Sequence, residues 1–468
     1  MSTLFQPDLL FANGRFRAGS GLLVNSEGKV ERLTGADEKP GKTKVVPLPG
    51  KALLPGFVNV HSHAFQRLIR GRTESRRRGG RDFWSWRGAM YHAAAALTPE
   101  QVYHSARMAF LEMALAGTTA VGEFHYIHRQ PDGQPYSDPN LLARQVIAAA
   151  GSVGIRIALL RTAYQRAGHK LPPDPGQVRF LESTEEFLSN TAALCADYHS
   201  PEAWVGVAPH SVRAVPVDAI AEMAAWAGGR DLPVHMHVAE QIAEVDACER
   251  EYGTTPVRLL ERHGILSGRF TAVHAIHIDP EEMHLLAEDG AAICACPTTE
   301  RNLGDGIFPA REAMAFRIPV ALGSDSQAQI EPLEDARQLE YHLRLHYRQR
   351  SLLDGIDEQE VSARLLRCAT ANGAAALGCD AGELEAGRLA DFFTIDLNDP
   401  SLVGNAEQDL LPMIVFGMRA GAIADVAVGG KFIVRDRRHP LQQEILKQYQ
   451  EVARSVWPVP QSVSETTP

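Results

Sequence analysis

The chain of 468 residues has few cysteines and no long apolar run. Six cysteines scattered over this length do not form the disulfide framework of a small secreted protein. No N-terminal segment joins a basic region to a long apolar stretch, and no run of apolar residues is long enough to span a bilayer. We therefore expect a globular cytoplasmic protein, and contents of 45% hydrophobic and 22% charged residues agree with that class.

An excess of positive charge is also missing, because the formal net charge is −10 at pH 7. This balance argues against a nucleic-acid-binding protein. The segment 70–87 differs from the rest, since its arginines outnumber its acidic residues. It could be a solvated loop, or it could attract a small anionic substrate to a nearby active site. Its arginines are Arg70, Arg72, Arg76, Arg77, Arg78, Arg81 and Arg87.

Short apolar runs recur along the middle of the chain and alternate with alanine- and leucine-rich stretches that are typical of helices. Strands of a parallel sheet that is covered on both faces are continuously apolar, as these runs are. Eight such strands alternating with helices predict an α/β protein with a (β/α)8 TIM-like barrel. The runs are LLPGFVNV, GTTAVGEF, GIRIALLR, AWVGVAPH, LPVHMHVAE, FTAVHAIHI, AAICAC and IPVALGSD.

The two ends of the chain have a β-rich pattern instead. The pairs Asn13-Gly14 and Glu27-Gly28 are typical of hairpin turns between short strands. We predict that both ends form one small β-sandwich domain beside the barrel. The predicted domains are residues 1–52 and 381–440 for the two parts of the β-sandwich, 53–380 for the metal-dependent barrel, and 441–468 for a C-terminal helix and tail.

Polar side chains gather where the predicted strands end, and that end of a barrel carries the chemistry. His61 and His63 are two residues apart, so both side chains point to the same side of the first strand. Alone, such a pair is more often structural, and an aspartate after a strand, such as Asp325, is usually a helix cap. Together with His237 they supply three imidazoles and a carboxylate, which suit a divalent transition-metal ion.

A cation at this position would make a water molecule more acidic. Glu240, three residues after His237, is then a natural proton carrier, and His274 could orient the water or stabilise developing charge. The segments AWVGVAPHSVRAV and GIRIALLRTAY contain no lysine to bridge two ions, so we expect a single ion. Cys294 and Cys296 have no partner motif and are expected to be buried thiols.

These residues resemble the amidohydrolase superfamily, and in particular its mononuclear aminohydrolases. The likeness covers nearly the whole chain and rests on HxH, HMHVAE, a histidine on the sixth strand and a final SD. More narrowly, NVHSHAFQRLIRGRTE, FWSWRGAMY, GEFHYIHR and CPTTERNLGDGIFP look like the formimidoylglutamate deiminase family of bacterial histidine degradation. The resemblance implies hydrolysis of N-formimino-L-glutamate to N-formyl-L-glutamate and ammonia.

The resemblance also implies roles for individual residues. One ion, zinc or else iron or manganese, would be bound by His61, His63, His237 and Asp325. Proton transfer and polarisation of the formimino group would fall to Glu240, His274 and Asp325. The substrate would contact Gln66, Arg87, Tyr126, His210 and Arg213. His235 and His277 should support the site or fill the core, and a homodimer is expected.

The sequence agrees with this substrate. N-formimino-L-glutamate has two carboxylates, and guanidinium groups bind carboxylates through paired hydrogen bonds. Arg87 and Arg213 are the candidates, and Trp84 and Trp86 indicate that the segment around Arg87 packs down. One alternative is an aminohydrolase for a heteroaromatic substrate such as a purine, a pterin or a chlorinated triazine, which would not need two arginines. Another is a non-catalytic scaffold, which we would expect to have lost metal ligands.

Overall fold

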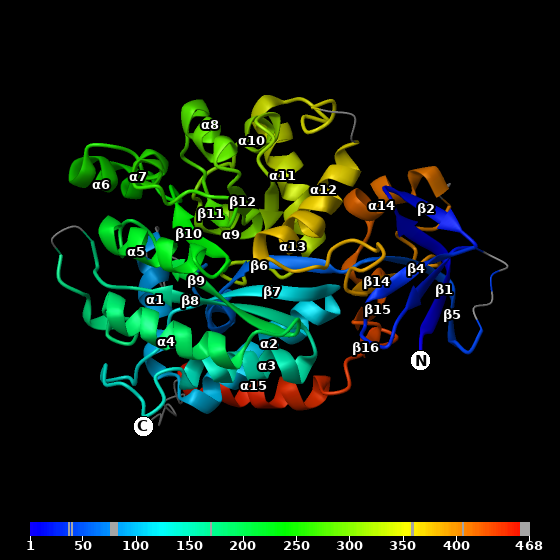
Figure 1. Cartoon of the computed structure of the whole chain (residues 1–468), viewed down its shortest axis with the longest axis horizontal. Coiled ribbons are helices and arrows are strands. Elements are labelled where there is room, and N and C mark those ends of the chain that lie inside the picture. The colour runs from blue at the N-terminus through cyan, green and yellow to red at the C-terminus, as the bar shows by residue number, and fades with distance from the viewer. Residues whose placement is uncertain are drawn as a thin grey trace, which may run out of the picture.

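The computed structural model describes residues 1–35, 38, 41–74, 83–168, 171–356, 360–404 and 407–458, with only the backbone of 83–85. Its main element is a parallel sheet of eight strands that curls into a barrel with helices around it (Figure 1). The predicted (β/α)8 barrel is therefore confirmed. In chain order, which is also their order in the sheet, the strands are β6 (Phe57–Ser62), β7 (Thr118–His125), β8 (Arg156–Ala163), β9 (Ala203–Pro209), β10 (Val234–Val238), β11 (Phe270–His274), β12 (Ala292–Ala295) and β13 (Val320–Leu322).

The barrel closes between its first and last strands, just beyond the end of β13. Ser62 and Asp325 form a parallel bridge there. The Asp325 N–H donates to the His61 carbonyl at 2.9 Å, and the His63 N–H donates to the Asp325 carbonyl at 3.0 Å. Gly323 permits this approach, because a Cβ at that position would lie 2.7 Å from the Cβ of His61. The closure therefore brings three of the four predicted metal ligands together.

Helices connect the strands and cover the outside of the barrel (Figure 1). Several begin with the expected signals; for example, Thr98 and Gln101 form a capping box at the start of α2. The helices along the barrel are α1 (Phe83–Ala96), α2 (Pro99–Leu115), α3 (Leu141–Val153), α4 (Thr184–Asp197), α5 (Val217–Gly228), α6 (Ile242–Tyr252), α7 (Pro256–Arg262), α8 (Pro280–Glu288), α9 (Pro297–Leu303), α10 (Ala310–Ala315), α11 (Pro332–Tyr347), α12 (Val361–Ala369) and α13 (Ala371–Leu377).

Both ends of the chain contribute to a second, mixed sheet beside the barrel, as predicted (Figure 1). Its central strand β5 pairs in parallel with β1 and antiparallel with β14, so it joins the N-terminal strands to the C-terminal ones. The predicted turn at Asn13 and Gly14 connects β1 to β2 with positive φ angles of 52° and 76°. The domain boundaries themselves stay a prediction. The strands are β1 (Thr3–Ala12), β2 (Arg15–Ala18), β3 (Gly21–Val24), β4 (Val30–Thr34), β5 (Lys44–Pro55), β14 (Phe392–Asp396), β15 (Ile423–Val428) and β16 (Lys431–Val434).

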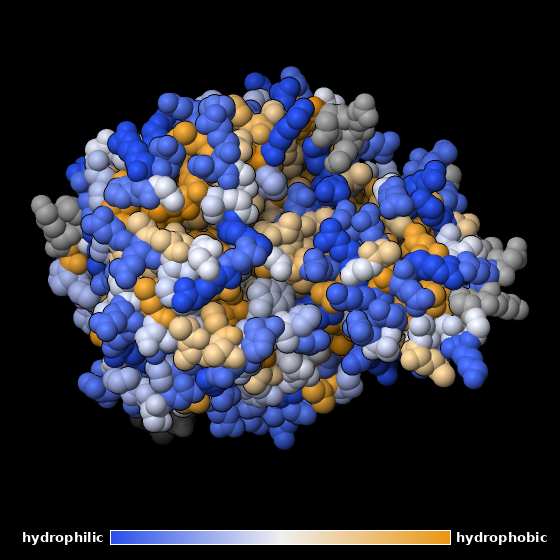
Figure 2. All heavy atoms as spheres, viewed as in Figure 1, coloured by the Kyte–Doolittle hydropathy of each residue, from blue (hydrophilic) through white to orange (hydrophobic). Residues whose placement is uncertain are grey.

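Helix α14 (Leu410–Gly417) comes before β15, and the last helix, α15 (Gln442–Val456), runs along the barrel beside α2 (Figure 1). Arg107 of α2 forms an ion pair with Glu444 of α15 at 2.8 Å. Hydrophilic residues cover most of the face seen in Figure 2. In the described part of the chain, no helix combines the length and the apolar character needed to cross a membrane. All six cysteines are free thiols, and Cys294 and Cys296 are buried.

Candidate functional site

Four side chains from distant parts of the sequence meet at the end of the barrel strands. His61 Nε2 lies 3.1 Å from His63 Nε2 and 3.1 Å from His237 Nε2. Asp325 Oδ1 lies 3.4 Å from His61 Nε2 and 3.3 Å from His63 Nε2. The four side chains are buried, and their donor atoms all lie within 4.8 Å of one another. The structure therefore places the predicted ligand set around one common point.

The hydrogen bonds on the other ring nitrogens show how these imidazoles are oriented. His63 Nδ1 lies 3.0 Å from the Phe124 carbonyl, and His237 Nδ1 lies 3.0 Å from the His210 carbonyl. A carbonyl can only accept, so both Nδ1 atoms carry the hydrogen and both Nε2 atoms present a lone pair. Both lone pairs face His61 Nε2, which has at most one hydrogen and cannot satisfy both.

Electrostatics agree with a cation at this point. Burial lowers the pKa of His61 to about 3 and lowers the pKa of His237 well below its usual value, so both rings are neutral. Burial acts to raise the pKa of Asp325, but the surrounding histidines together outweigh it and hold that pKa well below its usual range. Neutral imidazole nitrogens around an ionised carboxylate are the ligands that divalent transition metals prefer, so the residues fit such an ion.

The backbone at the strand ends is strained where these side chains turn inward. His274, the last residue of β11, has a φ of 71°, and Asp325 has a φ of 47°. Aspartate tolerates the left-handed region better than most residues, but histidine there is uncommon. Strain of this kind persists at sites where the surrounding structure holds the residue in place.

Glu240 and His274 lie next to the ligand cluster. His274 Nε2 is 4.0 Å from Glu240 Oε1 and 3.7 Å from Asp325 Oδ2, and it is buried without a hydrogen-bond partner in the described structure. Burial raises the pKa of Glu240, although His274 and Arg213 oppose this effect. For His274, burial acts to lower the pKa, but Glu240 and Glu300 outweigh it and raise that pKa well above its usual value. The pair can therefore hold and exchange protons beside the cluster.

A carboxylate that the sequence did not indicate supports His274 from behind. Glu300, on α9, has one oxygen 3.3 Å from His274 Nδ1 and accepts the Cys296 N–H at 2.8 Å with the same atom. Glu300 is buried, as is Glu123, which accepts from the Ser62 hydroxyl at 2.6 Å. These carboxylates fix the orientation of groups that reach the site.

A cavity opens above the cluster, and every predicted substrate-binding residue lines it. Gln66 donates to the Tyr126 hydroxyl at 2.8 Å, and His210 Nδ1 lies 3.1 Å from the Ser211 hydroxyl. The residues that line the cavity are His63, Gln66, Trp86, Arg87, Met90, Tyr126, Tyr164, His210, Arg213, His237, Glu240, His274, Leu303 and Asp325.

The two arginines give the cavity a positive wall. Burial acts to lower the pKa of Arg213, but Glu244, Tyr164 and Glu240 together outweigh it and keep that pKa above its usual value. Arg87 lies on α1 and donates through Nη2 to the Tyr164 hydroxyl at 3.2 Å. A wall with two guanidinium groups suits an anionic ligand with more than one carboxylate.

The other residues singled out in the sequence lie in different places. Arg76, Arg77, Arg78 and Arg81 of the basic segment, and the side chain of Trp84, lie outside the described residues, whereas Trp86 lines the cavity. His235 Nε2 bonds to the Ala376 carbonyl at 3.0 Å, and His277 Nε2 bonds to the Asp305 carbonyl at 3.0 Å. Neither histidine belongs to the ligand cluster. The cavity residues that the sequence reasoning missed are Met90, Tyr164 and Leu303.

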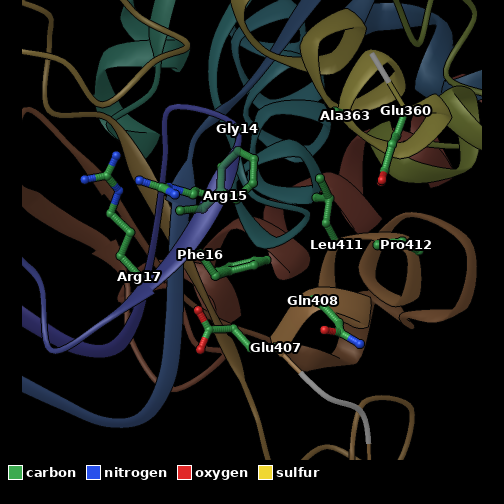
Figure 3. A pocket seen from close by; sticks show the side chains of 11 residues that line it. Gly14, Arg15, Phe16, Arg17, Glu360, Ala363, Glu407, Gln408, Leu411 and Pro412 are labelled. Carbon is green, nitrogen blue, oxygen red and sulfur yellow. The ribbon is translucent and has the colours of Figure 1, made fainter. Parts of the chain in front are cut away.

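A different cavity lies where the β1–β2 hairpin meets α12 and α14 (Figure 3). Its lining includes Arg15 and Arg17 from the hairpin and Glu360 and Glu407 from the facing segments. Figure 3 shows the ring of Phe16 between the two sides. None of the described ligand or cavity residues of the barrel belongs to it, and its charges are balanced.

Comparisons with known proteins found similar sequences and a similar solved structure. The model of the amidohydrolase family matches residues 52–433. Formimidoylglutamate deiminase of Pseudomonas aeruginosa is 40% identical over 86% of this chain and 89% of the relative. 8-oxoguanine deaminase of the same species is 30% identical over 91% of each chain. The crystal structure of an amidohydrolase from Brucella melitensis has a TM-score of 0.88 and 32% identity, and covers 97% of this chain and 99% of its own.

Proposed function

The chain belongs to the amidohydrolase family, and on that premise we propose that it hydrolyses N-formimino-L-glutamate to N-formyl-L-glutamate and ammonia. One observation carries the choice of substrate: Arg87 and Arg213 both line the cavity above the four-donor cluster. A dicarboxylate needs this arrangement, whereas a neutral heteroaromatic ring does not. The identity with a formimidoylglutamate deiminase supports the same reading.

The cluster would hold one divalent metal ion, which we propose to be zinc. His61, His63 and His237 would bind it through Nε2, and Asp325 through a carboxylate oxygen. When bound, the ion would supply the positive charge that makes a water molecule acidic enough to react near neutral pH.

Glu240 is proposed to move the protons of the reaction. It accepts a proton from the attacking water while oxygen bonds to the formimino carbon and the carbon–nitrogen double bond becomes single, and it donates that proton to the nitrogen. The second proton of the water, now on the new hydroxyl, passes to the same nitrogen as the carbonyl forms. The carbon–nitrogen bond breaks, ammonia leaves and the carbon becomes a formyl group. The raised pKa of Glu240 supports this role, because a carboxyl group that exchanges protons near neutral pH needs one.

His274 and Asp325 are proposed to assist at the same carbon. His274 Nε2 points a donor at the space beside Glu240, where negative charge develops as the carbon becomes tetrahedral. The neighbouring carboxylates keep His274 protonated and therefore able to donate. Gln66, Tyr126 and His210 would add hydrogen bonds that orient the substrate.

Ammonia release from N-formimino-L-glutamate tests the proposal, with guanine, 8-oxoguanine and adenosine as comparison substrates. We expect release from the formimino compound alone, and loss of release with a chelator. Preference for a purine would overturn the proposed substrate. A cytoplasmic location and a homodimer stay predictions.

A further inference from the structure

Four side chains behind the cavity form one hydrogen-bonded group: Arg87, Tyr91, Tyr164 and Gln177. Gln177 ends the short 3-10 helix Pro175–Gln177 and is fully buried, and Tyr164 follows β8 and is 3% exposed. Arg87 and Tyr164 line the cavity, whereas Tyr91 and Gln177 do not. Gln177 could not be identified from the sequence, because it lies in the long connection between β8 and α4.

Gln177 fixes the direction of the hydrogen bonds in this group. Its Oε1 accepts the Asp174 N–H at 2.8 Å, so the carboxamide cannot be turned the other way round. Its Nε2 then faces both phenols, 2.9 Å from Tyr91 Oη and 3.0 Å from Tyr164 Oη. A carboxamide nitrogen carries two hydrogens, so each phenol oxygen accepts one.

Arg87 donates a second hydrogen to each phenol. Its Nε donates to the Tyr91 hydroxyl, and its Nη2 donates to the Tyr164 hydroxyl at 3.2 Å. A phenol oxygen has two lone pairs and one hydrogen, so both acceptor positions of Tyr164 are taken and its hydroxyl can act only as a donor. The Tyr91 hydroxyl lies within hydrogen-bond reach of Tyr164, but Arg87 and Gln177 already occupy both of its acceptor positions, so the Tyr164 hydrogen is left for an acceptor in the cavity.

We propose that Tyr164 binds the substrate carboxylate that Arg87 binds, and that Gln177 is a positioning residue that keeps Tyr164 a donor. This inference rests on the proposed function, because N-formimino-L-glutamate brings the carboxylates. A carboxylate accepts hydrogen bonds and donates none, so it matches a site that offers a guanidinium and a hydroxyl hydrogen. The ring of His210 packs against Tyr164 with centroids 4.7 Å apart and helps to hold its direction.

Tyr164→Phe removes the donor and keeps the ring. We expect KM for N-formimino-L-glutamate to rise about 10- to 100-fold, the range of a hydrogen bond to a charged group, with kcat within about threefold. Tyr136→Phe is the matched control, since Tyr136 also accepts from an arginine, Arg179, but lies outside the cavity. An unchanged KM in Tyr164→Phe would overturn the proposal.

Gln177→Glu tests the positioning role, because the glutamate side chain has the same shape as glutamine but has an accepting oxygen in place of the donating NH2 group. A carboxylate has no hydrogens to give, so both phenols would turn their hydroxyls toward residue 177, and Tyr164 would cease to donate into the cavity. We expect a raised KM, and less than about a twofold further change when Tyr164→Phe is added. If adding Tyr164→Phe to Gln177→Glu raised KM by the full factor that Tyr164→Phe causes alone, the role of Gln177 would be overturned.

Calorimetry with N-formyl-L-glutamate separates this inference from the proposed function. If the wild type releases no ammonia from N-formimino-L-glutamate, the proposed reaction fails, whatever the variants do. Weaker binding of N-formyl-L-glutamate to Tyr164→Phe than to the wild type would still support the carboxylate site. Equal binding to both proteins, or no binding to the wild type, would overturn it.

Discussion

His61 Nε2 and His237 Nε2 lie 3.1 Å apart, although the two residues belong to the first and fifth strands of the barrel. Their rings are nearly perpendicular, at 89°, so both nitrogens point at one position rather than stacking. His237 Nδ1 donates its hydrogen to the His210 carbonyl, so His237 Nε2 has only a lone pair. The short distance between the two Nε2 atoms is favourable when a cation lies close to both.

The first prediction concerns metal content. His237→Ala should lose the metal and all ammonia release, because one of four ligands is missing. His235→Ala is the matched control on the same strand: it removes an equally buried histidine that bonds to a backbone carbonyl, and should retain the metal. Elemental analysis of the purified proteins measures both. Equal metal content in the two variants would contradict the assignment of His237.

The second prediction concerns proton transfer. Glu240→Gln should bind the metal normally and lower kcat by about 1,000-fold, the usual range for loss of a general acid–base group. Glu249→Gln, an exposed change on α6, serves as the control and should keep wild-type turnover. Metal analysis and steady-state ammonia release are measured on the same samples. A Glu240→Gln variant with nearly full turnover would end the assignment of Glu240 as proton carrier.

The third prediction concerns recognition of the substrate carboxylates. Arg213→Ala should lower kcat/KM for N-formimino-L-glutamate about 100-fold, since a charge-assisted hydrogen bond inside the cavity is lost. A formimino compound with no carboxylate should be used by variant and wild type alike. Arg269→Ala, which removes an exposed partner of Asp231, controls for loss of positive charge. If the two variants behaved the same, Arg213 would have no part in binding.

The fourth prediction concerns stability and pH. Glu182 pairs with Arg161 at 2.5 and 2.9 Å in the buried core. Burial acts to raise the pKa of Glu182, but His128 and Arg161 outweigh it and lower the pKa from 4.5 to about 2. Glu182→Gln should reduce the free energy of unfolding at pH 7 by about 3 kcal/mol, because it leaves a buried guanidinium without its counter-charge.

Because the folded pKa of Glu182 is depressed, its contribution is complete above pH 4.5 and is lost as the pH falls toward 2. The difference between wild type and Glu182→Gln should therefore shrink over that range in urea unfolding. Glu186→Gln breaks an exposed pair with Arg129 and should cost less than about 1 kcal/mol at any pH. A pH-independent difference for Glu182→Gln would contradict the depressed pKa.

The strands and the donor cluster could be predicted because each leaves a local pattern. A covered parallel strand must be apolar along its length, and residues at its end, such as His61 and His237, share one edge of the barrel by topology alone. The period of two along a strand also predicts that His61 and His63 point the same way, and their Nε2 atoms meet.

Residues such as Gln177 and Glu300 could not be found in this way. Gln177 contacts Tyr164 from a single 3-10 turn in the long connection between β8 and α4, which is too short to leave a periodic pattern. Glu300 lies one turn inside α9, at a position that reads as an ordinary exposed helix residue, and yet it is buried against His274. Such residues are identified by hydrogen bonds between distant segments, which a single sequence does not record.

Asp325 has two duties, because its backbone joins the last strand to the first and its side chain completes the donor cluster. An ion held by His61 and Asp325 would therefore cross-link the two edges of the sheet as well as serve the proposed reaction. Because the ion would bind the folded barrel and not the unfolded chain, a higher free metal concentration should raise the free energy of unfolding. The melting temperature would then report how much of the protein has metal bound.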